Sequence, residues 1–249
     1  MIELFIVFIL AIIMETVDSG LGLLYGTILS PLLIISGYNP FLVVPAILLS
    51  QALGGFMATY SHNKYKNAIW HPKSDDFKIS SMIIGLGIIA VIIGAYIGTS
   101  LPKLWLNTYI GIICTLMGGL VLTRIRFKFS LKKILLIGGI SAFNKALSGG
   151  GFGPLVATGN MASGIEEKKS IGITDFAEAP ICVMSFFAWV YFNGWPISNI
   201  LLPLCTGALI GGVVGPYALS KVKSRRLIRM LVGILALVSG LFMLYKVWI

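Results

Sequence analysis

The chain has 249 residues, of which 57% are apolar and only 11% charged, and its formal net charge is +10. Average soluble domains are about 25% charged, whereas this sequence contains repeated apolar runs of roughly 18 residues or more, long enough to cross a hydrocarbon core about 30 Å thick. The composition excludes a soluble globular protein or a nucleic-acid-binding protein. It predicts a polytopic membrane protein that is surrounded by the lipid bilayer.

The apolar stretches follow one another in chain order. The first, 1–36, is interrupted by DSGLG at 18–22, and 134–165 is interrupted by SGGG at 148–151. Residues 1–20 contain no lysine or arginine, so they are interpreted as mature structure and not as a cleaved signal peptide. Six uninterrupted membrane spans are expected at 41–60, 79–101, 104–123, 170–192, 197–219 and 230–247.

Basic residues predict the orientation of the spans. Sixteen of the 19 Lys and Arg residues fall within 64–78, 124–133, 168–169 and 221–229, and such segments remain in the cytoplasm by the positive-inside rule. The stretch 134–165 begins and ends beside cytoplasmic segments, so it is expected to enter the membrane and return on the same side. Its two arms, of about 12–15 residues each, are too short to span alone. Both termini are expected outside the cell.

The two halves of the sequence resemble each other. Matching positions recur in the same order: SGLG at 19–22 with SGGG at 148–151, Gly37 with Gly164, Gln51 with Glu178, and GAYIG at 94–98 with GGVVG at 211–215. We expect duplicated units at 1–123 and 133–249, joined by a basic linker at 124–132. Each unit would be a re-entrant broken-helix hairpin plus three transmembrane helices. An odd number of crossings then gives an all-α membrane protein built of two inverted repeats, with the glycine runs serving as helix-packing faces.

The segment NKALSGGGFGP, 144–154, has the features of an anion site. Glycine lets a ligand approach the backbone, and a second arm presents free N–H groups and the positive end of its dipole. Lys145 adds a positive charge. The alternative is that the glycines only permit close packing while Lys145 extends to the cytoplasmic face. The candidate substrate-binding residues are those of the two breaks and Gln51 of the span 41–60: Ser19, Gly20, Gly22, Gln51, Asn144, Lys145, Ser148, Gly149, Gly150 and Gly151.

Acidic residues inside apolar spans are functional hypotheses by default. Asp175 and Glu178 lie three residues apart on one face of a span, and Glu15 and Asp18 flank the first break. Carboxylates beside an anion site either pair with Lys145 or are protonated when the anion binds, and the second case gives proton coupling. Asp18, Asp175 and Glu178 are the candidate coupling residues, and Glu15 is interpreted as structural.

The sequence does not favour an enzyme. It contains no HExxH, GxSxG or Walker A motif. His62 and His71 are expected in a polar loop at the membrane interface, and the three cysteines lack metal-ligand spacing, so neither a metal nor another cofactor is expected. The main hypothesis is a secondary transporter for a small anion that alternates access by rocking its halves around the two breaks. An anion channel is the alternative. A homodimer is expected from the general tendency toward symmetric assembly.

Three motifs point to a family: SGGGFGPLVA at 148–157, GITDFAE at 172–178 and the glycine run of each half. In this order they resemble the sulfite exporter TauE/SafE family of bacterial membrane permeases over essentially the whole chain. The first break, SGLGLLYG at 19–26, differs from a full glycine cluster. The resemblance implies a bacterial inner-membrane protein that exports sulfite or a small organosulfonate such as sulfoacetate, with another small oxyanion or a carboxylate as the alternative. It also implies that the backbone of Gly149, Gly150 and Gly151 lines the path with Thr174, Asp175 and Glu178.

Overall fold

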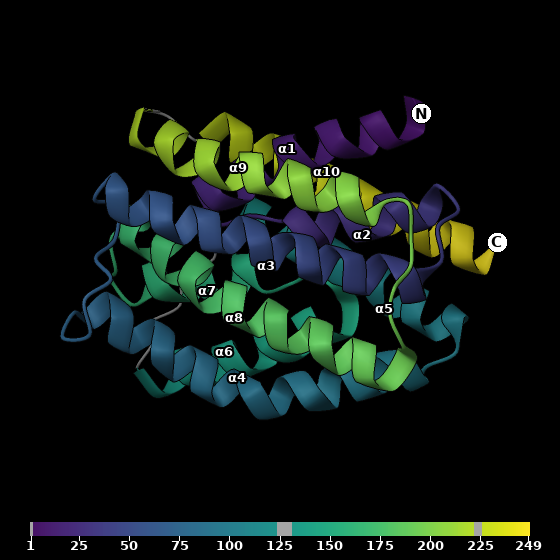
Figure 1. The fold of residues 1–249 in the computed structure, drawn as a ribbon, viewed down its shortest axis with the longest axis horizontal. Helices are drawn as coiled ribbons and strands as arrows, with labels where there is room; N and C mark the ends of the chain where they lie inside the picture. Colours follow the sequence, from purple (N-terminus) through teal and green to yellow (C-terminus); the bar gives the residue numbers. More distant parts are fainter. Residues whose placement is uncertain (1, 124–130, 222–225) are drawn as a thin grey trace.

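The computed structural model describes residues 2–123, 131–221 and 226–249, and within these ranges the regular secondary structure is entirely helical. The long helices run side by side in one bundle, and both termini lie at the same end of it (Figure 1). Most of the predicted basic linker, residues 124–130, lies outside the described residues. The described helices are α1 (Ile2–Leu21), α2 (Tyr25–Ile35), α3 (Pro40–Lys64), α4 (Asp75–Ser100), α5 (Lys103–Thr123), α6 (Leu131–Ser148), α7 (Gly153–Ala162), α8 (Glu167–Asn193), α9 (Leu201–Lys221) and α10 (Arg226–Trp248).

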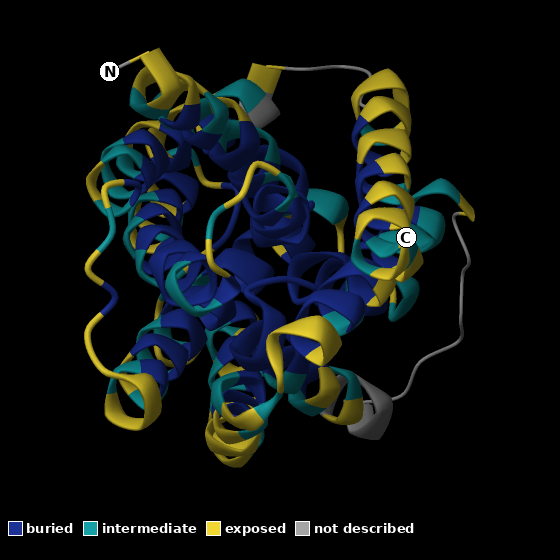
Figure 2. Cartoon of the chain, turned by 90° about the vertical axis from the view of Figure 1, so that its right-hand side faces the viewer, coloured by how far each residue is buried: buried dark blue, intermediate teal, exposed yellow. Residues whose placement is uncertain are grey.

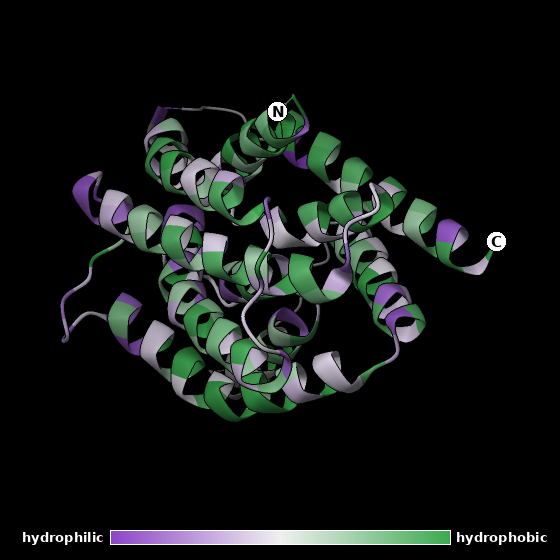
Figure 3. Ribbon diagram, turned by 45° about the vertical axis from the view of Figure 1, so that its right-hand side comes forward, coloured by the Kyte–Doolittle hydropathy of each residue, from purple (hydrophilic) through white to green (hydrophobic). Residues whose placement is uncertain are grey.

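Seven of the described helices are long and apolar enough to cross a membrane. Six of them, α3, α4, α5, α8, α9 and α10, coincide with the six predicted spans, and the seventh is α1. Large apolar side chains such as Ile89, Leu116 and Leu241 are exposed on the outside of the bundle, while buried residues fill its centre (Figure 2). Many of the most hydrophilic residues lie at helix ends (Figure 3). This distribution is that of a multi-pass membrane protein.

Local signals fix several helix ends. Asn39 accepts a hydrogen bond from the Phe41 amide (3.2 Å) just before Pro40 begins α3, and Ser74 accepts one from the Phe77 amide (3.2 Å) at the start of α4. Side-chain caps of this kind satisfy backbone N–H groups that have no partner inside the helix, and proline suits the first turn because it lacks an N–H group. These ends position the loops at opposite ends of the bundle.

Two breaks interrupt the apolar stretches. The second lies at the predicted SGGG, whereas the first begins at Gly22, the last residue of the predicted DSGLG, because α1 continues to Leu21. Residues 22–24 separate α1 from α2, and 149–152 separate α6 from α7. The predicted equal arms of 12–15 residues are wrong, because the first arms have 20 and 18 residues and the second arms only 11 and 10. Each break therefore joins a long helix to a short one, and the short one alone does not reach across a hydrocarbon core.

The backbone gives the two halves a common register. Among the described residues, six of the eight positive φ angles fall in three pairs that are each separated by 127 residues: Gly22 (69°) with Gly149 (75°), Leu24 (79°) with Gly151 (80°), and Gly37 (103°) with Gly164 (89°). The other two, Lys66 (56°) and Gly194 (83°), do not follow this spacing. The left-handed conformation is costly for a residue other than glycine, so its presence at Leu24 shows that the backbone geometry is kept where the side chain has changed. Sequence letters instead paired Gly20 with Gly149, and the backbone corrects that register by two residues.

Helix packing follows the same order of helices in the two halves. α1 packs on α9 as α6 packs on α4, α3 packs on α9 as α8 packs on α4, and the equivalent pairs α3–α8 and α5–α10 are in direct contact. The α9 glycines Gly207, Gly211 and Gly215 lie against the α1 backbone, and Gly94 and Gly98 of α4 lie against the α6 backbone. An added Cβ would meet those backbones, which confirms the interpretation of the glycine runs as close-packing faces.

Candidate functional site

A buried polar cluster lies where the last turns of α1 and α6 meet the middles of α3 and α8. It consists of Asp18, Gln51, Lys145 and Glu178, and all four side chains are buried. Lys145 Nζ lies 2.8 Å from Glu178 Oε1 and also donates to Gln51 Oε1. Gln51 Nε2 donates to Asp18 Oδ2 (2.6 Å) and to Glu178 Oε1 (3.0 Å). Lys145 is 1% exposed, so the alternative in which it extends to the membrane surface is wrong.

The cluster obeys the register of the backbone. Asp18 and Lys145 are separated by 127 residues, and so are Gln51 and Glu178. Each half therefore contributes one side chain from its first arm and one from its long third helix. The chemistry differs between the halves: the first provides a carboxylate and a neutral amide, and the second an ammonium group and a carboxylate. The positive charge of the site comes from the second half.

The two breaks touch each other through their backbones. A Cβ on Gly26 would lie 1.8 Å from the carbonyl oxygen of Gly149, and a Cβ on Gly153 would lie 3.0 Å from that of Gly22. These two contacts are equivalent under the 127-residue register. Glycine is required at Gly26 because no side chain fits between the two backbones. The contact holds the break of one half against the short helix of the other.

The amides at the second break have partners in this structure. The Gly151 N–H donates to Thr27 Oγ1 (2.9 Å), and the Gly150 N–H donates to Ser148 Oγ (3.3 Å). The prediction of free N–H groups at these two positions is therefore wrong. Hydroxyl oxygens occupy the places that oxygens of an anion would take, and Thr27, which sequence analysis missed, lies 124 residues away from its partner.

His62 is also placed differently from the prediction. It lies in the last turns of α3 and is fully buried, whereas His71 is exposed in the loop that follows. His62 Nε2 is 3.0 Å from Asp175 Oδ2 and 3.0 Å from the Ser19 carbonyl oxygen. A sequence signal existed, since His62 follows Gln51 by 11 residues, about three helical turns, and so shares its helix face.

Comparison with known proteins agrees with this architecture. The family model of the sulfite exporter TauE/SafE family matches residues 7–243. The chain belongs to this family. The "Probable membrane transporter protein YtnM" of Bacillus subtilis (strain 168) is 26% identical over 227 residues, which cover 85% of this chain and 73% of that protein. No solved structure matches the chain. The TauE/SafE match confirms the resemblance read from the sequence, and together with this relative it indicates a membrane transporter.

Other candidate residues of this TauE/SafE protein make local hydrogen bonds and do not join the four-residue cluster directly. Thr174 Oγ1 donates to Ser170 O (2.8 Å), and Ser19 Oγ donates to Glu15 O (2.6 Å). Asn144 Oδ1 accepts from the Tyr109 hydroxyl (2.5 Å). Gly20 packs against the Gly215 carbonyl, and the Ser148 hydroxyl donates to Asn144 O. Except for Thr174 of α8, these candidates lie in the last turns of the first arms, α1 and α6.

Acidic groups outnumber basic ones around the TauE/SafE cluster. Glu15, Asp18, Asp175 and Glu178 are all buried, and Lys145 is the only buried lysine or arginine among the described residues. Glu15 Oε2 and Asp18 Oδ1 have no hydrogen-bond partner within the described parts of the chain. No group of three or more His, Cys, Asp or Glu side chains in those parts could hold a metal ion. The cluster is therefore an acid-rich site organised around one ammonium group.

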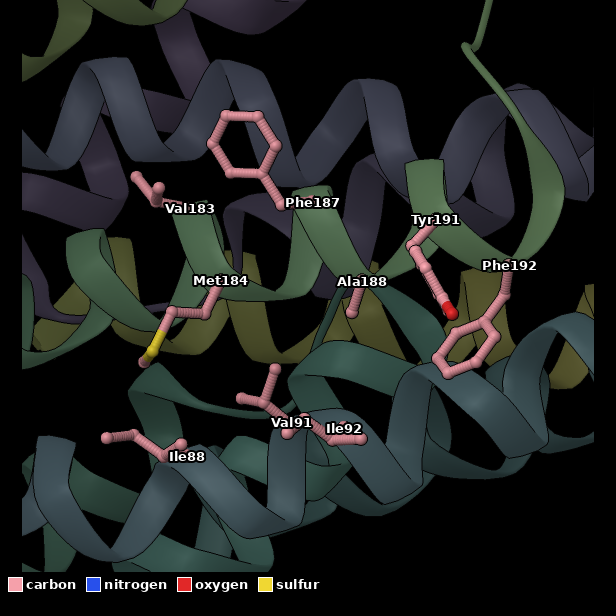
Figure 4. Close-up of a pocket in the computed structure, with 9 residues that line it drawn as sticks. All are labelled: Ile88, Val91, Ile92, Val183, Met184, Phe187, Ala188, Tyr191 and Phe192. Carbon is pink, nitrogen blue, oxygen red and sulfur yellow. The ribbon is translucent and has the colours of Figure 1, made fainter.

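The TauE/SafE bundle also has an apolar groove of about 440 Å³ between α4 and α8 (Figure 4). Side chains such as Val91, Met184 and Phe187 line it, and all its described lining residues are apolar or aromatic. Phe187 and Tyr191 are 60% and 84% exposed on the outside of the bundle. The groove thus faces the lipid-exposed surface, and its described lining offers no charged group that would bind an anion.

Proposed function

We propose that this chain is a secondary transporter for a small sulfur-containing anion, sulfite or an organosulfonate such as sulfoacetate, in the bacterial inner membrane. The observation that carries the proposal is the buried Lys145 beside the contact between the two helix breaks. An ammonium group inside a membrane protein is costly and marks an ion pathway by default. The family description, sulfite exporter, supports the sulfur-containing class.

The hydrogen bonds of the cluster suggest how an anion would bind. At present Glu178 and Gln51 satisfy Lys145. If Glu178 accepts a proton, it no longer compensates the ammonium charge, and Lys145 becomes able to bind an anion oxygen. The nearby amides of Gly150 and Gly151 would exchange their hydroxyl partners for further anion oxygens, because charge-assisted hydrogen bonds are the stronger ones. A proton and an anion then enter the site together.

The charge balance supports proton coupling. Four buried carboxyl groups surround one ammonium group, and two carboxyl oxygens lack a hydrogen-bond partner among the described residues. An uncompensated carboxylate in an apolar interior is expensive, so such a cluster takes up protons or a cation in place of the missing positive charge. Asp18, Asp175 and Glu178 remain the proposed coupling residues.

We further propose that the units 1–123 and 133–249 are inverted repeats that rock against each other. The 127-residue register, the equivalent helix contacts and the reciprocal contacts of the two breaks support this relation. The positions of both termini at one end of the bundle agree with the proposed external location of both (Figure 1). Alternating access then moves one unit around the shared cluster.

The direct test is flux of labelled sulfite and of labelled sulfoacetate in proteoliposomes. Anion flux above that of empty vesicles is expected, and it should saturate with concentration. Asp175→Asn and Glu178→Gln should reduce flux and flatten its pH dependence, and variants with wild-type flux and pH dependence would remove the coupling proposal. No flux of either anion, or of small carboxylates, would remove the transporter proposal. Single-channel currents in planar bilayers would favour the channel alternative.

A further inference from the structure

His62 is a buried titratable group that the proposed anion site does not use. Its side chain connects three elements: Nε2 faces Asp175 of α8 and the Ser19 carbonyl of α1, and Nδ1 is 3.2 Å from Nδ2 of Asn67 in the loop after α3. Asn67 also donates to the Pro216 carbonyl of α9 (3.2 Å). His62 therefore lies between the loop 65–74 and the acid-rich cluster.

The position equivalent to His62 in the second half shows which hydrogen bond the packing of the helices requires. Trp189 follows His62 by 127 residues, and its Nε1–H donates to the carbonyl of Ala146 (2.6 Å), which in turn follows Ser19 by 127 residues. A ring N–H bound to the first arm is thus common to both halves, and tryptophan supplies it. Histidine adds a second nitrogen, and its partner Asp175 is equivalent to Leu48. The His62–Asp175 pair therefore has no polar equivalent at Trp189 and Leu48.

The hydrogen bonds fix the protonation of the ring. Asn67 Nδ2 donates to the Pro216 carbonyl, so the amide nitrogen is the atom that faces His62 Nδ1. An amide nitrogen only donates, and therefore Nδ1 is an acceptor and the ring proton is on Nε2, facing Asp175 and the Ser19 carbonyl. The ring is neutral. It can accept a proton at Nδ1, on the loop side, and release one from Nε2 on the side of Asp175.

We propose that His62 relays protons between the loop 65–74 and Asp175. This role rests on the proposed proton-coupled transport. A proton arriving from the loop side forms an Nδ1–H bond, and the Nε2–H bond breaks as its proton passes to Asp175 Oδ2, 3.0 Å away. The imidazole is neutral before and after, and the cluster gains one proton on Asp175, one helical turn from Glu178. Rotation of the Asn67 amide then presents its oxygen to the new Nδ1–H group. Lys66, the residue before Asn67, is exposed, so this part of the loop reaches the surface.

The charged groups around His62 favour movement of a proton from the ring toward the carboxyl groups. Asp175 contacts the ring from α8, and Asp175 in turn interacts with Glu178 on the same helix and with Glu15 and Asp18 of α1. α9 contributes the uncharged Pro216 carbonyl, and the neighbouring lysines, Lys64 on α3 and Lys66 in the loop, are exposed. A proton on the ring is thus attracted toward the carboxyl groups.

The test separates coupling from transport in proteoliposomes to which labelled sulfoacetate, whose sulfonate stays ionised, is added from outside, with labelled sulfite in parallel. Uptake driven by a pH gradient is compared with exchange at equal pH and saturating anion on both sides. His62→Gln keeps an N–H donor for the Ser19 carbonyl, but its amide cannot accept and release a proton as an imidazole does. We expect gradient-driven uptake to fall at least tenfold and exchange to stay within twofold of wild type. His71→Gln, in the exposed loop, is the matched control and should change neither.

Retention of gradient-driven uptake by His62→Gln would overturn the relay while leaving anion transport intact. Loss of both activities would assign His62 a structural role and also overturn the relay. Absence of all flux in the wild type would instead remove the proposed function. A measurement without substrate is independent of these outcomes: in ¹⁵N-histidine-labelled His71→Gln protein, the remaining imidazole should carry its proton on Nε2 at neutral pH. A proton on Nδ1 would contradict the relay.

Discussion

The contact between the two helix breaks predicts a graded response to added methyl groups. In Gly26→Ala the new Cβ would lie 1.8 Å from the Gly149 carbonyl oxygen and 3.0 Å from Ile47. Contacts of real Cβ atoms essentially never fall under 3.0 Å, so the backbones must separate by at least 1.2 Å. Overpacking of a filled interior typically costs about 1–3 kcal/mol. The rigid backbone on both sides places Gly26→Ala at the upper end, about 2–3 kcal/mol.

Two other glycine-to-alanine variants serve as controls for Gly26→Ala. Gly153→Ala makes the equivalent contact with the Gly22 carbonyl at 3.0 Å, which small shifts relieve, so a cost under about 1 kcal/mol is expected. Gly119→Ala on α5 meets nothing within 4 Å and should stay within about 0.5 kcal/mol of wild type. For a chain of this size, each kcal/mol shifts the melting temperature by roughly 2–4 °C.

The assay is thermal unfolding in one detergent at a fixed scan rate, because membrane proteins often unfold irreversibly. Gly26→Ala should melt roughly 4–12 °C below wild type, with Gly153→Ala between it and Gly119→Ala. Gly26→Ala should also lose anion flux, since the breaks no longer meet. A melting temperature of Gly26→Ala equal to that of Gly119→Ala would refute the reasoning, because the two breaks would then not be in contact.

Three further outcomes are expected. Lys145→Met leaves the buried Glu178 carboxylate without its cation and should cost about 3–5 kcal/mol of stability. Adding Glu178→Gln should restore most of this loss. A double variant no more stable than Lys145→Met alone would contradict the Lys145–Glu178 ion pair. Thr27→Val leaves an amide without an acceptor and should cost about 1–3 kcal/mol, whereas Ser30→Ala, whose hydroxyl has no partner among the described residues, should be nearly neutral in the same melting assay. Tyr38→Phe should cost about 0.5 kcal/mol. Partial burial and its hydrogen bond to Glu3 (2.8 Å) raise the pKa of Tyr38, so this contribution is complete below pH 10 and is lost as the pH rises above that; equal differences between variant and wild type at pH 8 and pH 11 would contradict it.

Local sequence features predicted much of the fold. Apolar runs located six spans because each run satisfies its backbone hydrogen bonds within one helix. The glycine-containing segments DSGLG and SGGG marked both breaks, although the first break, at 22–24, begins only at the last glycine of its segment. Lys145 and Glu178 were already candidates, since charges inside apolar spans are rare. These features depend on residues close in sequence, and the structure preserves them.

Features that depend on distant packing were not predictable in the same way. His62 is buried because the loop after α3 folds back over it: Trp70 stacks on Phe176 with ring centroids 4.5 Å apart, and Ala68 lies against Gly172. The loop sequence, which contains two lysines, gave no indication that it covers His62. The equivalence of Asp18 and Lys145 was hidden as well, because the shared letters SG at the two breaks favoured a register two residues away.

That equivalence has a consequence for the energetics of the transport cycle. A protein with two chemically identical inverted halves would have the same free energy whether it opened inward or outward. Here the related positions bear opposite charges, a carboxylate in one half and an ammonium group in the other. In the proposed alternating-access cycle the two halves exchange environments, so the electrostatic energy differs between the inward-open and outward-open states. We therefore expect the empty protein to prefer one of these two states even without a gradient across the membrane.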